Sequence, residues 1–409
     1  MTQTTSTAPT PSSNSRLHCL LLALILMAGL LLRIIPSAGF KGTGFDETFY
    51  RTYVTMATKV GLLNYPAIVE DYLRYQKSID YTVLPPLRFL YIASGYLWVK
   101  IFGSAPLPAL HHVSCFFNCL MLVLSYVFVR ACANRNLALA ATAFMAFAPT
   151  QIHMSQHALI DGFFAFWATL TIFVLWKNLN RPNHPGWLTA YTALLALLII
   201  NKENAFFAFI GILAILLCNR WFAFGTVTPR LLLCTVVGPI VGASLLCMLA
   251  GGLPVVIEVY KQVVSKAIVL PYAIKTGDGP WYRYLVELLL VNPLVFLLAI
   301  GRVFQLRKDD RPLWFFVVFV AASYLVMCNV RYGMNLRYTN MWDLPLCILA
   351  ASQLALVCRA FKERSPLVMT VLVACICALE LKNYVLFTIE NKMYEMVPDT
   401  VLESLKIVK

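Results

Sequence analysis

Residues 17–49 read LHCLLLALILMAGLLLRIIPSAGFKGTGFDETF, and this stretch decides the class of fold. The run from Leu17 to Ile35 carries one basic residue, Arg33, and matches the roughly 18–20 apolar residues that cross a bilayer. It lacks a well-placed small-residue cleavage site and many apolar runs follow, so we expect a retained first span, not a signal peptide. Two adjacent acids, Asp46 and Glu47, come one loop later. Ionisable groups at a bilayer border often mark function.

The composition of the whole chain agrees with this first stretch. Of 409 residues, 60% are hydrophobic and 13% are charged, and the mean hydropathy is +0.73. This balance predicts a polytopic membrane protein. The net charge of +14 fits basic cytoplasmic loops, because no basic run interleaved with stacking aromatics indicates nucleic-acid binding.

Missing motifs exclude several classes of protein. The sequence has no P-loop and no GxGxxG, which argues against an ATP-driven pump and a Rossmann enzyme. It also has no paired CxxC and no HExxH, so a zinc site has little support. Most of the 12 cysteines lie in apolar runs and read as small hydrophobic side chains.

We predict an all-α fold, a polytopic bundle of about eleven transmembrane helices placed by hydrophobic length. The loops after the second, fourth, sixth, eighth and tenth spans each carry more than one Lys or Arg, which predicts a cytoplasmic N-terminus and an outside C-terminus. The predicted spans are roughly 17–35, 109–130, 137–153, 162–176, 187–200, 204–219, 231–250, 283–301, 313–329, 339–357 and 366–382.

Three parts are expected along the chain. Residues 1–15 are rich in Thr, Ser and Pro and predict a disordered cytoplasmic tail. Residues 16–355 form a membrane module with a long extracytoplasmic loop at 36–108, and residues 356–409 hold a last span and an outside tail. We find no convincing internal repeat, which weakens a transporter interpretation.

One segment of the outside loop, VLPPLRFLYIASGYLWVKIFG, is apolar enough to span the membrane. A crossing there would invert every later loop and break the charge rule. We therefore predict an interfacial helix, with Arg88, Tyr91, Tyr96 and Trp98 suited to the headgroup zone.

Further polar groups fall on the same outside rim as Asp46 and Glu47. A lipid phosphate bound at this rim would need cations, and a sugar would need carboxylates and rings. These groups are His157 and Asp161 after the third span, Asn201–Asn204 at the tip of a hairpin, Trp281–Tyr284 before the eighth span, and Arg331, Arg337 and Tyr338 before the tenth.

An ordered set of stretches resembles the C-type integral-membrane glycosyltransferases, closest to the branch of protein O-mannosyltransferases and aminoarabinose-to-lipid-A transferases. The stretches are FDETFY, PPLRFLYIASGYLWVKIFG, APTQIHMSQHALIDGFFAF, NKENAFFAF, GPWYRYLVELLL and NLRYTNMWDLPLCILAA. They occur in the family's order up to about residue 355. Two positions depart from the family pattern: Asn201-Lys202-Glu203 in the hairpin, and Gln156-His157 where a basic residue is common.

The resemblance implies transfer of a sugar from a polyprenyl or dolichyl phosphate, with inversion, to an acceptor on the extracytoplasmic face. Asp46 matches the catalytic aspartate and Glu47 its partner. A carboxylate suits the task, since a general base must take the proton of the attacking hydroxyl. Lys202 matches the hairpin lysine, and with Arg337 is expected to hold the lipid phosphate. Further candidate substrate-binding residues are Asp161, His157, Tyr282 and Tyr284.

No cofactor follows from the sequence, and no metal is demanded, although some relatives in the wider superfamily use a divalent ion. The expected partners are the lipid-phosphate-linked sugar donor, a glycan, lipid or protein acceptor, and membrane lipids. The sequence leaves the sugar and the acceptor open. A bacterial inner membrane is preferred because no long soluble domain is inserted, and an endoplasmic reticulum membrane is the alternative.

Simpler interpretations stand beside these roles. Asp46 and Glu47 suit the first turn of a helix as caps. Lys202 and Glu203 are able to form a local ion pair, and Arg337 to anchor in headgroups. The tyrosines match an aromatic belt. At the level of the whole protein, a flippase for a lipid-linked sugar is the main rival, and a non-catalytic subunit of a glycosylation complex is the third possibility.

Overall fold

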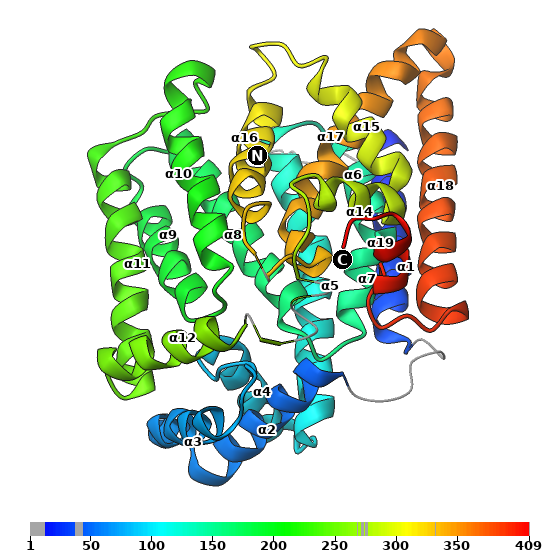
Figure 1. Ribbon diagram of the computed structural model, residues 1–409. Helices are drawn as coiled ribbons and strands as arrows, with labels where there is room; N and C mark the ends of the chain where they lie inside the picture. The colour runs from blue at the N-terminus through cyan, green and yellow to red at the C-terminus, as the bar shows by residue number, and fades with distance from the viewer. Residues whose placement is uncertain are drawn as a thin grey trace, which may run out of the picture.

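The computed structural model describes residues 13–36, 44–267, 269–270, 274, 277–331 and 333–408, and within them it is helical with no strand, which confirms the predicted all-α class. Most helices stand side by side in one bundle (Figure 1). The elements are α1 (Ser13–Ile34), α2 (Phe45–Val60), η1 (Leu62–Asn64), α3 (Tyr65–Ser78), α4 (Phe89–Phe102), α5 (Pro106–Cys132), α6 (Arg135–Phe147), α7 (Pro149–Ser155), α8 (Ile160–Asn180), α9 (Pro185–Ile199), α10 (Ala205–Phe222), α11 (Pro229–Ala250), α12 (Leu253–Ala267), α14 (Arg283–Val291), α15 (Pro293–Val303), α16 (Arg311–Met327), η2 (Leu336–Trp342), α17 (Asp343–Cys358), η3 (Arg359–Arg364), α18 (Ser365–Tyr384), η4 (Val385–Glu390) and α19 (Asp399–Ser404).

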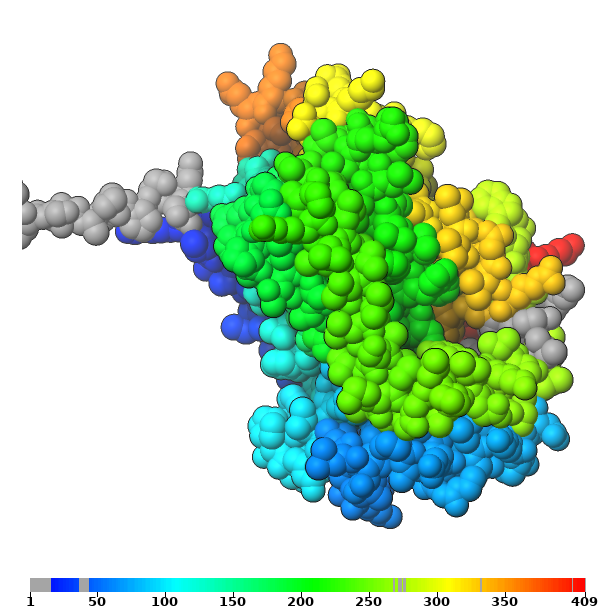
Figure 2. Space-filling model, turned by 90° about the vertical axis from the view of Figure 1, so that its left-hand side faces the viewer, coloured from blue at the N-terminus to red at the C-terminus, as the bar shows by residue number. Residues whose placement is uncertain are grey.

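A cap formed by α2, η1, α3 and α4 covers one end of the bundle, at the bottom of Figure 1. Figure 2 shows α12 lying directly over the blue surface of the cap. The ammonium group of Lys266 donates to the carbonyl oxygens of Gln76 and Ile79, and Glu258 lies 3.4 Å from Lys77. We call this end of the bundle the cap face and the other end the opposite face.

Every predicted span coincides with a helix or with two helices in sequence. The third span breaks before Pro149, where α6 and α7 meet at 55°, since proline lacks the N–H that would continue the helix. The eighth span breaks at Asn292–Pro293 in the same way. Among the described residues, six helices are long and apolar enough to cross a membrane, or seven with the bent pair. The chain is thus a multi-pass membrane protein, and the number eleven stays a prediction.

Small residues set how closely neighbouring spans approach. A Cβ on Gly238 of α11 would lie 2.6 Å from the Cβ of Leu195 on α9, and one on Gly242 would lie 2.6 Å from the carbonyl oxygen of Ala196. Glycine therefore allows these backbones to touch, as is common between helices in lipid. Aromatic side chains fill the core on the other side of the bundle, where Phe128 packs against Phe316 with ring centroids 5.1 Å apart.

Two expectations from the sequence need correction. Helix α1 begins at Ser13, inside the predicted tail, while residues 1–12 lie outside the described residues. The predicted interfacial helix does form as α4, but Tyr91 is fully buried and Arg88 is 9% exposed, so neither side chain is open to lipid headgroups. The reason is packing, because α4 lies against α2 and α5 and encloses both side chains.

Candidate active site

Asp46 lies in the first turn of α2, where the chain enters the cap. Its Oδ2 accepts a hydrogen bond from Nη1 of Arg337 over 3.1 Å. Arg337 belongs to η2, which leads into α17 of the bundle, and the two residues are 291 positions apart in the sequence. The Asp46 side chain stays 23% exposed, so the pair joins cap and bundle while leaving the carboxylate accessible.

Glu47, the neighbouring acid, points to different partners. Its carboxylate accepts hydrogen bonds from the backbone N–H of Gly44 and of Ala158, each over 2.7 Å. Nδ1 of His157 lies 3.5 Å from the same carboxylate. Burial alone would raise the pKa of Glu47, but the hydrogen bonds from His157, Gly44 and Ala158 outweigh it and lower the pKa. The capping alternative therefore describes Glu47, which closes the first turn of α2 and ties it to the segment before α8.

Asp161 and Lys202 form a buried ion pair. Asp161 sits in the first turn of α8, and Lys202 lies in the turn between α9 and α10. The ammonium group of Lys202 also lies 4.1 Å from the ring centroid of Tyr338. Burial lowers the pKa of Lys202 to about 8, against the opposing effect of Asp161. The alternative of a local pair between Lys202 and Glu203 is wrong for this fold, because Glu203 faces Arg88.

Arg88 was expected in the headgroup zone, and its place in the site was not predicted from the sequence. Its Nε lies 3.1 Å from the Glu203 carboxylate, and its Nη1 donates to the hydroxyl of Tyr50. This contact links the cap to the hairpin that carries Lys202, and the N–H of Leu90 donates to the carbonyl of Ile200 over 2.9 Å beside it. The signal available in the sequence was a lone basic residue, Arg88, at the start of the apolar run that forms α4.

The segment after η4 closes the site from the other side. Glu395 lies 3.6 Å from Nε of Arg337, so Arg337 stands between two carboxylates, those of Asp46 and Glu395. The carbonyl oxygen of Tyr394 lies 2.8 Å from Nε2 of His153, and the Tyr394 ring meets the His157 ring at 5.0 Å. Burial raises the pKa of Glu395, with Arg337 acting in the opposite direction.

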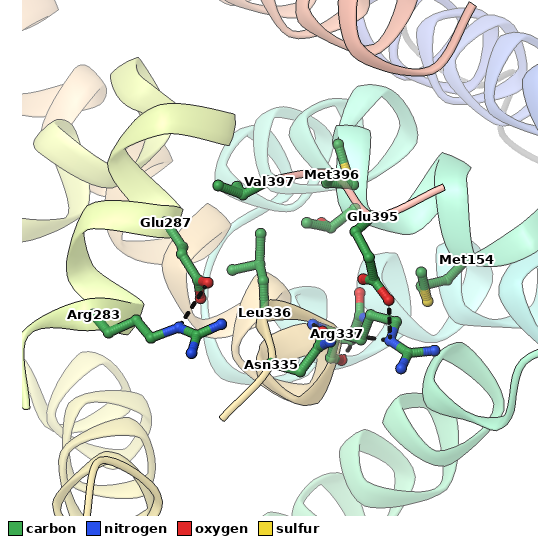
Figure 3. A pocket seen from close by; sticks show the side chains of 11 residues that line it. Met154, Arg283, Glu287, Asn335, Leu336, Arg337, Glu395, Met396 and Val397 are labelled. Carbon is green, nitrogen blue, oxygen red and sulfur yellow. Dashed lines mark hydrogen bonds and ion pairs between the residues drawn. The ribbon is translucent and has the colours of Figure 1, made fainter. Parts of the chain in front are cut away.

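Figure 3 shows the pocket beside Arg337, with Glu395, Met396 and Val397 along one wall and the Arg283–Glu287 pair across from them. Nε of Arg283 donates to Glu287 over 3.0 Å. The pocket holds about 20 Å³, which is room for roughly one water molecule. A sugar therefore does not fit while residues 395–397 keep this position.

The remaining predicted residues lie at different distances from this centre. His157 is buried beside Glu47. Tyr284 is buried, and its hydroxyl oxygen accepts a hydrogen bond from the N–H of Asn335 over 3.4 Å, so it supports the start of η2. Tyr282 is 40% exposed before α14, and its recorded ring contact is with Trp281. Among the described residues, no group of three His, Cys, Asp or Glu side chains is arranged to hold a metal ion.

Known proteins resemble this chain in part of its sequence and in its fold. Residues 85–269 match the family of dolichyl-phosphate-mannose-protein mannosyltransferases, and no curated protein matches the chain. ArnT from Cupriavidus metallidurans bound to undecaprenyl phosphate superposes with a TM-score of 0.55 at 12% identity, over 96% of this chain and 75% of that one. The fold is therefore that of the C-type integral-membrane glycosyltransferases, and the resemblance seen in the sequence is confirmed.

Two further structures come from Archaeoglobus fulgidus. The oligosaccharyltransferase tethered with an acceptor peptide containing the NVT sequon gives a TM-score of 0.61 at 14% identity, over 89% of this chain and 55% of that one. AglB in complex with an inhibitory peptide and a dolichol-phosphate gives 0.57 at 12% identity, over 95% and 57%. This chain thus spans just over half the length of those relatives.

Proposed function

We propose that this protein is a glycosyltransferase that moves a sugar from a polyprenyl- or dolichyl-phosphate donor to an acceptor at the cap face. The observation that carries the proposal is the Asp46–Arg337 pair, 3.1 Å long and partly open, at the junction of cap and bundle. It joins a candidate base to a candidate phosphate ligand. The family match and the relatives solved with undecaprenyl phosphate and dolichol-phosphate support a lipid-phosphate donor.

In the proposed reaction, Asp46 is the general base. Its carboxylate takes the proton of the acceptor hydroxyl as that oxygen attacks the anomeric carbon of the sugar. The bond between the anomeric carbon and the phosphate oxygen breaks, and the lipid phosphate leaves with the bonding electron pair. Attack from the face opposite the leaving group inverts the anomeric centre.

The leaving phosphate gains charge in the transition state, and preplaced cations stabilise that charge. We assign this task to Arg337 and Lys202. Among the described residues, Nη1 of Arg337 donates to Asp46 and Nε donates to Asn335, and we assign the remaining Nη2 group to a phosphate oxygen. A sugar would enter the pocket beside Arg337 only if residues 395–397 moved, since that pocket has room for roughly one water molecule.

Other residues hold these groups in position. We assign Glu47 and His157 to the entry of α2, because Glu47 fixes the turn that presents Asp46. Asp161 holds Lys202, and Tyr284 supports η2 under Arg337. Tyr282 is proposed to contact the lipid chain of the donor, since it lies half-exposed at the start of α14.

For location, we propose a cytoplasmic N-terminus, an extracytoplasmic cap face and a bacterial inner membrane. The support is the charge of the loops at the opposite face, which carry Arg181, Arg220, Arg230 and Arg359. Reporter fusions in the α8–α9 turn and after α4 test this topology. An active cytoplasmic reporter is expected at the first position and an active extracytoplasmic reporter at the second, and the reverse pattern would contradict the proposal.

The test of function uses the purified protein with a synthetic polyprenyl-phosphate-linked sugar. Mass spectrometry follows release of polyprenyl phosphate and gain of the sugar by the acceptor. Asp46→Asn is expected to lower the rate about 10²–10⁴-fold, the typical contribution of a general base. Asp80→Asn is the matched control, because Asp80 is an exposed acid of the same cap. Equal rates for the two variants would refute Asp46 as the base.

Two further experiments identify the acceptor and test whether a divalent ion takes part. Gene deletion followed by mass spectrometry of glycoconjugates identifies the acceptor as the species that loses a sugar. Treatment with EDTA decides whether a divalent ion takes part, and we propose that turnover persists because Arg337 and Lys202 supply the positive charge. A flippase would move the donor across vesicle membranes without releasing polyprenyl phosphate, so the same assay separates the two functions.

A further inference from the structure

A large cavity lies at the opposite face, away from the candidate active site. It has a volume of about 1110 Å³. The α5–α6 turn, the α15–α16 loop, the end of α17 and the start of α18 surround it. In Figure 1 this end of the bundle is at the top, opposite α2, α3 and α4.

Four arginines line the cavity, and three of them are exposed and lack a carboxylate partner among the described residues. Those three are Arg135, Arg307 and Arg359. The fourth, Arg302, is buried and satisfied, because it donates to Asp310 over 2.9 Å and to the hydroxyl of Ser352 over 3.0 Å. Asp309 is the one other acid of the lining. The cavity therefore has an excess of positive charge.

Helix ends add to this positive character. The first turns of α6, α16 and α18 all belong to the lining of the cavity. The N-terminus of a helix carries a partial positive charge, which favours anions. The arginine side chains and the helix N-termini that line the cavity thus both favour the binding of an anion.

The wall between the arginines is apolar. It is formed by side chains of the α5–α6 turn, α16, α17 and α18, including Leu137, Leu313, Leu356 and Met369. A small free anion would make no use of such a wall. An amphiphile with an anionic head and hydrocarbon chains matches both parts of the lining, and basic pockets between membrane helices are known to take lipid headgroups.

We propose that this cavity binds an anionic phospholipid, with the phosphate of its headgroup between Arg135, Arg307 and Arg359 and its chains along the apolar wall. Arg302 is not a ligand in this site, because its donors are already used to hold the α15–α16 loop against α17. The site lies at the other end of the bundle from Asp46, so it is independent of the donor site proposed above.

Native mass spectrometry of the full-length protein in detergent provides the test, with phosphatidylglycerol and phosphatidylcholine added in separate titrations. The cavity variant is Arg135→Gln, Arg307→Gln, Arg359→Gln. The matched control is Arg181→Gln, Arg220→Gln, Arg230→Gln, which removes the same charge from exposed arginines of the same face that do not line the cavity. Size-exclusion chromatography of both variants verifies that they remain folded, and Arg359→Gln alone replaces the triple variant if it aggregates.

Wild type and control are expected to retain phosphatidylglycerol in preference to phosphatidylcholine. The cavity variant is expected to bind it about 10²-fold more weakly, and Arg359→Gln alone several-fold more weakly, because each basic residue near an anionic lipid contributes on the order of a few-fold in affinity. Equal losses in cavity variant and control would show a general effect of charge and overturn the proposal. Displacement of the lipid by millimolar inorganic phosphate would identify a free-phosphate site and would overturn it as well.

Discussion

The two ends of the bundle use the same kinds of charged side chain in opposite ways. At the cap face, cations meet acids from distant parts of the chain in the pairs Asp46–Arg337, Asp161–Lys202 and Arg88–Glu203. At the opposite face, Arg135, Arg307 and Arg359 are exposed and, among the described residues, have no carboxylate partner.

This difference separates the proposed catalytic arrangement from an electrostatic surface. Taking charges out of water costs several kcal/mol per ion, so buried pairs rarely add much stability by themselves. They do hold groups in a fixed geometry, which is what a reaction centre requires. Exposed arginines keep their hydration and stay available to whatever anion approaches. Four predictions break or sharpen this comparison.

Arg337→Gln carries the largest expected effect. Loss of the guanidinium removes a cation from the leaving phosphate and frees Asp46, so turnover of the lipid-linked donor is expected to fall about 10²–10³-fold. Steady-state release of polyprenyl phosphate measures it. Arg51→Gln is the control, because Arg51 is an exposed arginine of α2 in the same cap. Turnover within twofold of the control would mean that the pair only clamps cap to bundle.

Lys202→Met is expected to act on folding and on binding together. It leaves Asp161 buried without its cation, and breaking a buried pair in this way costs roughly 3–5 kcal/mol. Unfolding in detergent measures the loss. The double variant Asp161→Asn, Lys202→Met removes both charges and is expected to regain stability but not affinity for the donor. Recovery of full transfer by the double variant would leave Lys202 with a purely structural role.

Glu47→Gln tests the acid that faces away from the reaction centre. A glutamine oxygen can accept from Gly44 or Ala158, but its NH₂ group then meets an N–H, so one buried donor loses its partner. This costs about 1–3 kcal/mol. A lower unfolding temperature than for Glu70→Gln, an exposed acid of α3, is the expected result. If instead stability is unchanged and turnover collapses, Glu47 takes part in the chemistry directly.

The pH profile gives the smallest expected effect. Because burial lowers the pKa of Lys202 to about 8, its ammonium is charged below that pH and neutral above it. The KM for the donor is therefore expected to rise about tenfold per pH unit above pH 8. Lys202→Arg keeps the charge and should move this rise to higher pH. If the KM of the variant rises over the same pH range as that of the wild type, the titrating group is not Lys202.

The helices were predictable, and the pairings among them were not. Hydrophobic length located each predicted span because the bilayer sets the length of an apolar run. The two helix breaks have a signal in the sequence, namely Pro149 and Pro293, although the bend itself depends on packing. Alternation of the loops between the two sides of the membrane predicted a shared rim. It placed Asp46, Asp161, Lys202 and Arg337 at the same end of the bundle.

Which acid meets which cation depends on the crossing of helices far apart in sequence. Nothing local indicated that Lys202 would take Asp161 and leave Glu203 to Arg88. Glu395 was missed for a similar reason, since KMYEMVPD after the last span looks like an ordinary polar tail. Its return to Arg337 rests on Met396 and Val397, which are buried in the core.

The separation of 291 positions between Asp46 and Arg337 has a consequence for biogenesis. Helix α2 is synthesised early, while η2 is synthesised only after α16. During that interval Asp46 lacks its ion-pair partner Arg337, so this contact between the cap and the bundle cannot form. A nascent chain halted before η2 thus has the cap helices but lacks Arg337, so quality control that senses the seating of the cap would also sense whether the candidate active site has been assembled.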